Sequence, residues 1–371
     1  MKKFLIYFVI IYWFTILTGC ASNSGLTYTT DSSSGSVIIE NTSTDKNDTA
    51  NNYIVTTSEI TKLERGFSAV RYDGDYSFDR FLEQGGAKSD QDVLKFLTEN
   101  IFGKDYGLQM GKDTFGCSTI SVKNSDGGYL FGRNFDWQSC DALVVTAYPT
   151  NGYTSISTVN LDFIKQGAEF VSYYISDEVM STAALYAPLD GMNEKGLCVS
   201  VNMIQDNATI SQDTGKPDIT TTTAIRLMLD KAATTEEALD LLRQYDLHAS
   251  MNYMVHFAIA DSEGNSVAVE YIDNEMIVTR TPVLTNFYLA EGEKNGVGTQ
   301  QSHTRFEILT RTLEENTDMT VPEVRDVLDS VSKDNFNEYE STEWSIVFDQ
   351  SALTAIYYHR ENYETGYPFQ L

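Results

Sequence analysis

Apolar and polar residues are distributed in three different ways along the chain. Phe4–Leu17 is an almost unbroken apolar run, and Ala21–Asn52 is rich in Ser, Thr, Asn and Asp with little apolar content. From Tyr53 onward, apolar residues recur at helical or strand spacing. A segment with so little apolar surface to bury cannot offset the entropy lost on ordering. We therefore expect a folded body from residue 53 and a flexible tether over residues 20–52.

The first twenty residues have the layout of an export signal. Two lysines precede the apolar run, which is too short for a comfortable membrane span. The run ends in Leu17-Thr18-Gly19-Cys20, which resembles a bacterial lipobox, in which the cysteine carries the lipid. We expect a lipoprotein signal peptide over residues 1–19 and an extracytoplasmic, membrane-anchored protein lipidated at Cys20. An ordinary secretory signal with a chance cysteine is the alternative.

Residues 53–116 are expected to form a small, mostly helical pro-segment. Ser89 is a suitable N-cap because acidic residues follow it in the first turn. Gly103 is suited to end the same helix. The apolar face of this helix consists of Val93, Leu94, Leu97 and Ile101.

The remaining residues, 117–371, alternate between strand and helix patterns. Strands are expected near 117–122, 129–135, 253–260, 266–271, 276–279, 344–348 and 352–359. Helices are expected near 222–232, 235–244, 302–313 and 321–332. Antiparallel strand pairs with helices inserted between them predict a layered α+β body.

Composition narrows the function. The 371 residues include 26 Lys+Arg and 53 Asp+Glu, a formal net charge of −27, which argues against a nucleic-acid partner because such binding needs a basic surface. The four histidines have no metal-ligand spacing, and the chain has no GxSxG, Walker or GxGxxG motif. We therefore expect no metal and no cofactor.

Cys117 is the cysteine best placed for chemistry. It follows Gly116 at the start of a predicted strand, the layout of a hidden N-terminal nucleophile. If the Gly116–Cys117 bond is cut, the new α-amine shares a residue with the thiol, and its ordinary pKa of about 7.7–8.0 suits a general base. A buried structural cysteine is the alternative. Cys140 and Cys198 are either core thiols or, in an exported protein, a disulfide.

Two runs of residues connect the chain to a known family. Cys117-Ser118-Thr119-Ile120 followed by Gly132-Arg133-Asn134-Phe135-Asp136-Trp137 resembles the signature of the choloylglycine hydrolase, or linear amide C–N hydrolase, family. This family includes conjugated bile acid hydrolases and penicillin V acylases, with acid ceramidase-like amidases as relatives. The resemblance implies a four-layer αββα fold of the N-terminal-nucleophile (Ntn) hydrolase type and cleavage of linear, non-peptide amide bonds.

The resemblance also implies the site residues. Cys117 matches the nucleophile, Arg133 the residue that orders the thiolate, and Asp136 the residue that holds the α-amino group. Further matches supply two oxyanion-hole asparagines and an arginine that supports the nucleophile electrostatically. These three residues are Asn202 after Asn193-Glu194-Lys195-Gly196-Leu197, Asn286 in Leu284-Thr285-Asn286, and Arg305 in Thr304-Arg305-Phe306.

The 116 residues before Cys117 depart from the bile salt hydrolases and resemble the acid ceramidase layout, in which self-cleavage produces two chains. We expect the same cut at Gly116–Cys117. A penicillin V acylase, an N-acyl-amide or ceramide-like amidase and an acyltransferase remain alternatives, as does a non-catalytic solute-binding lipoprotein. The expected partners are a small N-acyl amide and, through the lipid, a membrane; a homo-oligomer stays open. Candidates for an apolar acyl site are Phe163, Phe170, Tyr173, Tyr174 and Tyr186.

Overall fold

The computed structural model describes residues 53–105, 108, 116–165, 175–336 and 340–371. The predicted signal peptide, the lipidation site Cys20 and the tether therefore lie outside the described residues, as do Phe170, Tyr173 and Tyr174. Within the described ranges, no helix combines the length and apolar character that crossing a membrane requires.

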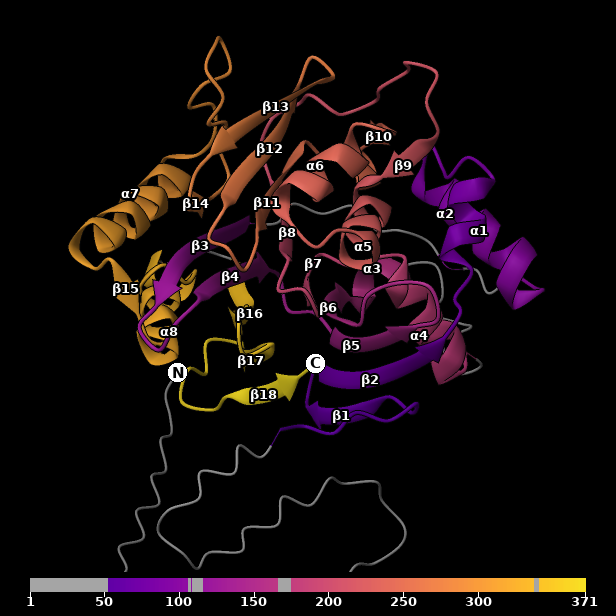
Figure 1. The fold of residues 1–371 in the computed structure, drawn as a ribbon, viewed down its shortest axis with the longest axis horizontal. Helices are drawn as coiled ribbons and strands as arrows, with labels where there is room; N and C mark the ends of the chain where they lie inside the picture. The colour runs from indigo at the N-terminus through magenta and orange to yellow at the C-terminus, as the bar shows by residue number, and fades with distance from the viewer. Residues whose placement is uncertain (1–52, 106–107, 109–115, 166–174, 337–339) are drawn as a thin grey trace, which may run out of the picture. The chain divides into compact units, whose positions relative to one another are not determined.

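Two β-sheets form the centre of the body (Figure 1). The larger sheet has the strand order β1-β2-β5-β6-β7-β8-β11-β12-β13. Its strands are β1 (Thr61–Glu64), β2 (Phe67–Gly74), β5 (Ala142–Pro149), β6 (Ser155–Asn160), β7 (Asp190–Asn193), β8 (Cys198–Met203), β11 (Val255–Ala260), β12 (Ser266–Ile272) and β13 (Glu275–Arg280).

The smaller sheet has the order β14-β3-β4-β16-β17-β18, with β15 pairing β3 beside this path. Its strands are β3 (Gly116–Asn124), β4 (Tyr129–Trp137), β14 (Val283–Leu284), β15 (Asp318–Met319), β16 (Ser341–Asp349), β17 (Thr354–His359) and β18 (Tyr367–Gln370). A separate parallel pair joins β9 (Asp218–Thr220) to β10 (Asp246–His248).

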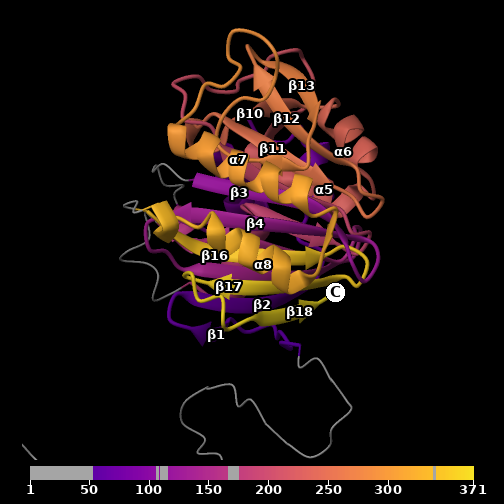
Figure 2. The ribbon, with the colours of Figure 1, turned by 90° about the vertical axis from the view of Figure 1, so that its left-hand side faces the viewer.

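Helices cover the outer face of each sheet. α7 (Gln300–Glu315) and α8 (Val321–Ser330) lie across β3, β4 and β16 in Figure 2. The larger sheet is covered by α3 (Leu161–Lys165), α4 (Asp177–Leu185), α5 (Thr221–Lys231) and α6 (Thr235–Leu242). With β3 packed against β8 between them, the layers run helix, sheet, sheet, helix. The α+β, four-layer prediction is confirmed.

The prediction of a mostly helical segment over residues 53–116 was wrong for its first part. β1 and β2 form a strand pair at the edge of the larger sheet, and β2 pairs in parallel with β5. Phe67, Ala69 and Val70 are buried in that position. The partner strand lies far along the chain, so local periodicity gave little sign of this pairing.

The second part of the same segment is helical as predicted. α1 (Phe78–Glu83) is followed by α2 (Asp90–Leu97) and a π-helical turn, Thr98–Phe102. Ser89 caps α2, because its Oγ accepts the backbone N–H of Asp92 at 3.2 Å. Gly103 ends the turn with a φ of 67°, a left-handed conformation that glycine adopts without steric cost.

A buried polar contact fastens this N-terminal segment to α5. The hydroxyl of Tyr76 donates to the carboxylate of Asp230, which also forms an ion pair with Arg226 at 3.3 Å. Tyr186 donates to the backbone carbonyl of Tyr76 at 2.9 Å. Burial raises the pKa of Asp230. The contact therefore joins the parts of the chain on either side of Cys117 without a covalent bond.

The other predicted elements of the body are present within a few residues. The elements that were not predicted there are β5 to β10, β14, β15, β18, α3 and α4. The three cysteines among the described residues, Cys117, Cys140 and Cys198, are all buried and free. The disulfide alternative for Cys140 and Cys198 was therefore wrong, since burial of two thiols does not require that they meet.

Candidate active site

Cys117 lies near the start of β3, between the two sheets. Its Sγ is 3.5 Å from Nη2 of Arg133 and 3.5 Å from the backbone oxygen of Val201 on β8. The side chain is fully buried. Burial raises the pKa of the thiol to about 12, although Arg133 acts in the opposite direction. In this arrangement the sulfur is a protonated thiol that donates to the Val201 carbonyl.

Arg133 on β4 is held on both sides. Its Nη1 donates to the backbone oxygen of Val201 at 3.1 Å, and its Nε lies 2.8 Å from Oδ2 of Asp190. The indole of Trp344 donates to that same carboxylate oxygen at 3.0 Å. Asp190 precedes the Asn193 motif and was not among the predicted site residues; only its place beside that motif pointed to it. These contacts fix the guanidinium beside the sulfur.

Asp136 belongs to the same motif as Arg133 but points to the opposite face of the sheet. Residues three apart on a strand have opposite parity, so one faces the other sheet and the other faces the helices. Oδ2 of Asp136 forms an ion pair with Arg305 of α7 at 2.5 Å, and Oδ1 accepts the hydroxyl of Thr342 at 2.7 Å. Among the predicted residues, Arg305 therefore contacts Asp136 rather than the sulfur.

Gly116 is the strand partner of Asp136 in the β3–β4 register. A Cβ at residue 116 would lie 2.9 Å from Oδ2 of Asp136 and 3.1 Å from Cε of Lys333. Both distances are shorter than ordinary van der Waals contact. The absence of a side chain at residue 116 is therefore what allows a carboxylate and a lysine to approach the peptide that precedes Cys117.

Asn286 contacts Cys117 directly. Its Oδ1 accepts the backbone N–H of Cys117 at 2.9 Å, and its Nδ2 donates to the carbonyl of Met203 at 2.7 Å. Asn202 instead points its Nδ2 at the carbonyls of Leu284 and Thr285, each at 3.3 Å. A donor role for Asn202 at an oxyanion would require it to give up one of these two long bonds.

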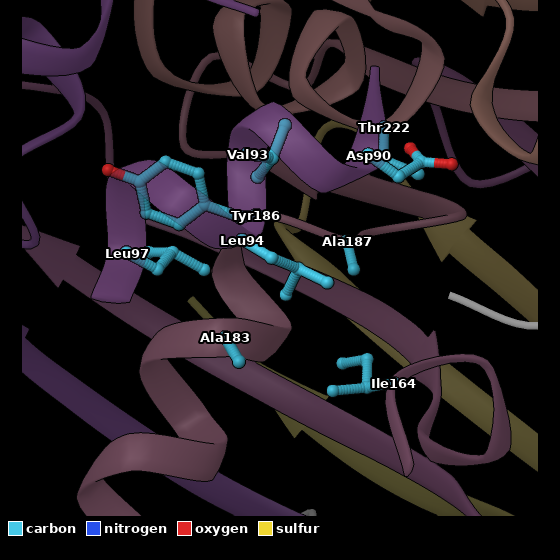
Figure 3. Close-up of a pocket in the computed structure, with 9 residues that line it drawn as sticks. All are labelled: Asp90, Val93, Leu94, Leu97, Ile164, Ala183, Tyr186, Ala187 and Thr222. Atoms are coloured by element: carbon cyan, nitrogen blue, oxygen red, sulfur yellow. The ribbon is translucent and has the colours of Figure 1, made fainter. Parts of the chain in front are cut away.

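An aromatic wall extends away from Cys117. Phe135 is the strand partner of Cys117, and its ring stacks near Trp137 with centroids 6.3 Å apart. Trp137 in turn meets Phe163 of α3 edge to face at 4.7 Å. The next residue, Ile164, lines a small apolar pocket that also contains Tyr186 (Figure 3).

That pocket lies where α2 of the N-terminal segment meets α3, α4 and α5. Figure 3 shows the side chains that these elements contribute to its lining. The lining residues are Asp90, Val93, Leu94, Leu97, Ile164, Ala183, Tyr186, Ala187 and Thr222. Burial raises the pKa of Asp90, the one ionisable carboxylate in this lining. The pocket is therefore suited to apolar groups.

A cysteine at the head of a central strand, inside a four-layer αββα sandwich, defines an N-terminal-nucleophile hydrolase fold. Residues 117–287 match the family model described as linear amide C–N hydrolases, choloylglycine hydrolase family, and the match begins at Cys117. Over these residues the chain is similar to linear amide C–N hydrolases of this family. Within the described ranges there is no group of three or more His, Cys, Asp or Glu side chains that could hold a metal ion.

A solved structure agrees with the fold, and a second is reported beside it. A mutant of conjugated bile acid hydrolase from Clostridium perfringens aligns with a TM-score of 0.51 and 17% identity, over 69% of this chain and 92% of that chain. Penicillin V acylase from Agrobacterium tumefaciens aligns with a TM-score of 0.46 and 19% identity, over 66% of this chain and 83% of that chain. At 17% identity the first of these structures describes the fold and leaves the substrate open.

Proposed function

We propose that this chain cuts itself between Gly116 and Cys117, and that the N-terminal cysteine then hydrolyses the amide bond of an N-acyl substrate. The observation that carries this proposal is the position of Cys117. Its sulfur lies 3.5 Å from a buried guanidinium, and its own backbone nitrogen is held by Asn286. The family match beginning at the same residue supports it.

The self-cleavage step transfers an acyl group from nitrogen to sulfur. The thiol of Cys117 attacks the carbonyl carbon of Gly116, a C–S bond forms, and the C–N bond breaks as the nitrogen takes up a proton. Water then hydrolyses the thioester, which releases the Gly116 carboxylate and restores the thiol. Asp136 is the strand partner of Gly116, the residue before the new N-terminus. Its carboxylate would therefore lie close to the α-ammonium group of Cys117. An ammonium beside the sulfur would favour the thiolate.

In turnover, the thiolate attacks the amide carbonyl of the substrate. The α-ammonium gives its proton to the leaving amine, and the resulting α-amine then removes a proton from the water that hydrolyses the acyl-enzyme. Asn202, Asn286 and backbone N–H groups are the candidate donors to the oxyanion, and loss of one such donor typically slows catalysis by about 10²–10³. Arg133 stabilises the thiolate before it attacks the substrate and again when hydrolysis of the acyl-enzyme releases it.

The substrate is best described by its acyl group. The aromatic rings of Phe135, Trp137 and Phe163 extend from Cys117, and Ile164, the residue after Phe163, lines an apolar pocket. Both features favour an apolar acyl chain or ring system. A bile salt, penicillin V and an N-acyl amine all satisfy this description. An acyltransferase would use the same acyl-enzyme with an amine in place of water. A panel of glycocholate, taurocholate, penicillin V and an N-acyl ethanolamine, each scored for released amine, would separate these substrates.

The proposed location is the outer side of a bacterial membrane. It depends on the lipobox-like Leu17-Thr18-Gly19-Cys20. Lipid on Cys20 would anchor the N-terminal part, and the contact between Tyr76 and Asp230 would keep the catalytic part attached after the cut. Metabolic labelling with a clickable fatty acid, compared between the natural chain and Cys20→Ala, tests this location.

Mass spectrometry of the purified protein tests the cleavage and the nucleophile together. The natural chain should yield a fragment that begins at Cys117. Cys117→Ala should abolish both processing and amide hydrolysis, whereas Cys140→Ala, which removes an equally buried thiol, should leave both within about threefold. A fully active, intact single chain would refute the cleavage step. Failure of a thiol-reactive amide mimic to label Cys117 would instead favour a solute-binding lipoprotein.

A further inference from the structure

In the backbone peptide that joins Thr285 to Asn286, both the carbonyl and the N–H group form hydrogen bonds with side chains. The carbonyl of Thr285 accepts Nε2–H of His256 at 2.9 Å as well as the amide of Asn202. The backbone N–H of Asn286 donates to Oγ of Ser302 at 2.7 Å. This peptide carries the side chain that holds the nitrogen of Cys117, so its orientation sets the position of that side chain.

His256 is fully buried, and its neighbours determine which of its ring nitrogens carry protons. A backbone carbonyl only accepts hydrogen bonds, so Nε2, which faces Thr285, carries a proton. Nδ1 lies 3.1 Å from Oε1 of Glu270. If Glu270 is ionised, Nδ1 must carry a proton as well, because otherwise two lone pairs would face each other at that distance.

The surroundings of Glu270 favour the ionised form. Its two carboxylate oxygens accept the backbone N–H groups of Leu289 at 2.9 Å and Ala290 at 2.6 Å. Burial acts to raise the pKa of Glu270, but His256 and these N–H groups outweigh it and leave that pKa below its usual value. Both ring nitrogens of His256 therefore face acceptors, the Glu270 carboxylate and the Thr285 carbonyl, and both act as donors.

We propose that His256, held by Glu270, is a positioning residue for the active site. The loop 285–290 is held at both ends. His256 binds its first residue, Thr285, and Glu270 binds its last two residues, Leu289 and Ala290. Asn286, which binds the backbone of Cys117, lies between the two ends. His256 is also the strand partner of Asn202, so both side chains reach the same carbonyl from adjacent strands. The inference rests on the proposed function.

Kinetics of two substitutions test the proposal. In His256→Leu the donor to Thr285 is lost, and a displacement of Asn286 of about 1 Å should lower kcat by about 100-fold with KM within about twofold. His256→Gln retains an N–H donor and should recover kcat to within about tenfold of the natural chain. The matched control is His248→Gln, because His248 also pairs with a carboxylate, Asp218 at 2.8 Å, outside this loop. A kcat for His256→Leu within threefold of the natural chain would overturn the proposal.

A measurement on the natural chain covers the case in which these variants do not fold. Nuclear magnetic resonance of protein labelled with ¹⁵N-histidine should resolve two protonated ring nitrogens for His256 at neutral pH. A single ring N–H signal would overturn the assignment of both ring nitrogens as donors. This measurement does not depend on turnover, so it still reports on the pair if the chain cleaves none of the N-acyl amides tested and the proposed function fails.

Discussion

Arg305 and Asp136 form a fully buried ion pair, 2.5 Å between Nη1 and Oδ2, on the side of β4 opposite to the sulfur of Cys117. The pair links α7 to the strand beside Gly116. Its partners lie on separate elements, so it fixes the distance between a helix and the sheet it covers. The charged side chains of this site therefore lie on two faces of one strand, with Arg133 on the face toward the sulfur and Asp136 on the face toward the helices.

Removal of one member of this pair should be costly. Arg305→Met leaves the Asp136 carboxylate buried with Thr342 as its remaining side-chain donor, and we expect a loss of about 3–5 kcal/mol in the free energy of unfolding. Arg325→Met on α8 is the control, because Arg325 and Asp326 form an exposed pair worth less than about 1 kcal/mol. Urea unfolding measures both. Equal losses in the two variants would contradict the buried-pair interpretation.

Gly116→Ala should slow self-cleavage. The added Cβ meets Asp136 and Lys333 at 2.9 and 3.1 Å, so the scissile peptide must shift away from the carboxylate, and we expect the rate of processing to fall by about tenfold or more. Mass spectrometry over time measures the intact fraction.

Gly366→Ala provides the matched control for this crowding. Its Cβ would meet a side-chain methyl of Ile356 at 2.9 Å at the far edge of the same sheet. This variant should process at the natural rate. A similar delay in both variants would assign the effect to sheet stability rather than to the scissile peptide.

The ionisation of Cys117 should differ before and after the cut. In the uncut chain the pKa of the thiol is raised to about 12, so the thiol stays protonated at neutral pH and loses its proton only as the pH rises far above neutrality. Gly116→Ala, if it holds the chain uncut, should show no ultraviolet thiolate absorbance from Cys117 below about pH 10. The processed chain, with an ammonium group beside the sulfur, should show it at lower pH. A thiolate signal at neutral pH in the uncut form would argue against the buried thiol.

Tyr76→Phe should weaken attachment of the N-terminal segment. It removes the hydroxyl that donates to the buried Asp230, and we expect a loss of about 1–3 kcal/mol in the free energy of unfolding. Tyr72→Phe is the control, because the hydroxyl of Tyr72 forms an exposed bond to a backbone carbonyl at 3.4 Å. Urea unfolding of the processed protein, followed by gel filtration of the two parts, provides the measurement. Equal stability of the two variants would contradict a stabilising role for the hydrogen bond between Tyr76 and Asp230.

Sequence patterns predicted the helices and strands that depend on residues close to one another along the chain. Ser89 caps α2 as expected, and the strands on either side of the turn at 124–128 lie where their residue types place them. The same reasoning missed β2, because its stability comes from Ala142–Pro149, which is remote in sequence. A strand whose main partner lies far along the chain carries few signals of its own.

The site could be predicted as a set of residues but not as a geometry. The family resemblance named Cys117, Arg133 and Asn286, and the structure places Arg133 and Asn286 in contact with Cys117. The resemblance gave no sign that Asp136 faces the helices, although the odd spacing from Arg133 within one strand contains that information. Asp190 and His256 were missed, because a buried ionisable residue is identified by its partners, and these lie on other strands.

The position of β2 has a practical consequence for protein production. A gene fragment that starts at Cys117 would omit β1 and β2, and the backbone groups along one side of Ala142–Pro149 would lose their partners. Six residues of that strand are buried. The fragment would therefore expose an unpaired, apolar strand edge, which promotes aggregation. Recombinant enzyme for crystals or biocatalysis should therefore be made from a coding sequence that retains residues 53–116 and matures in the host.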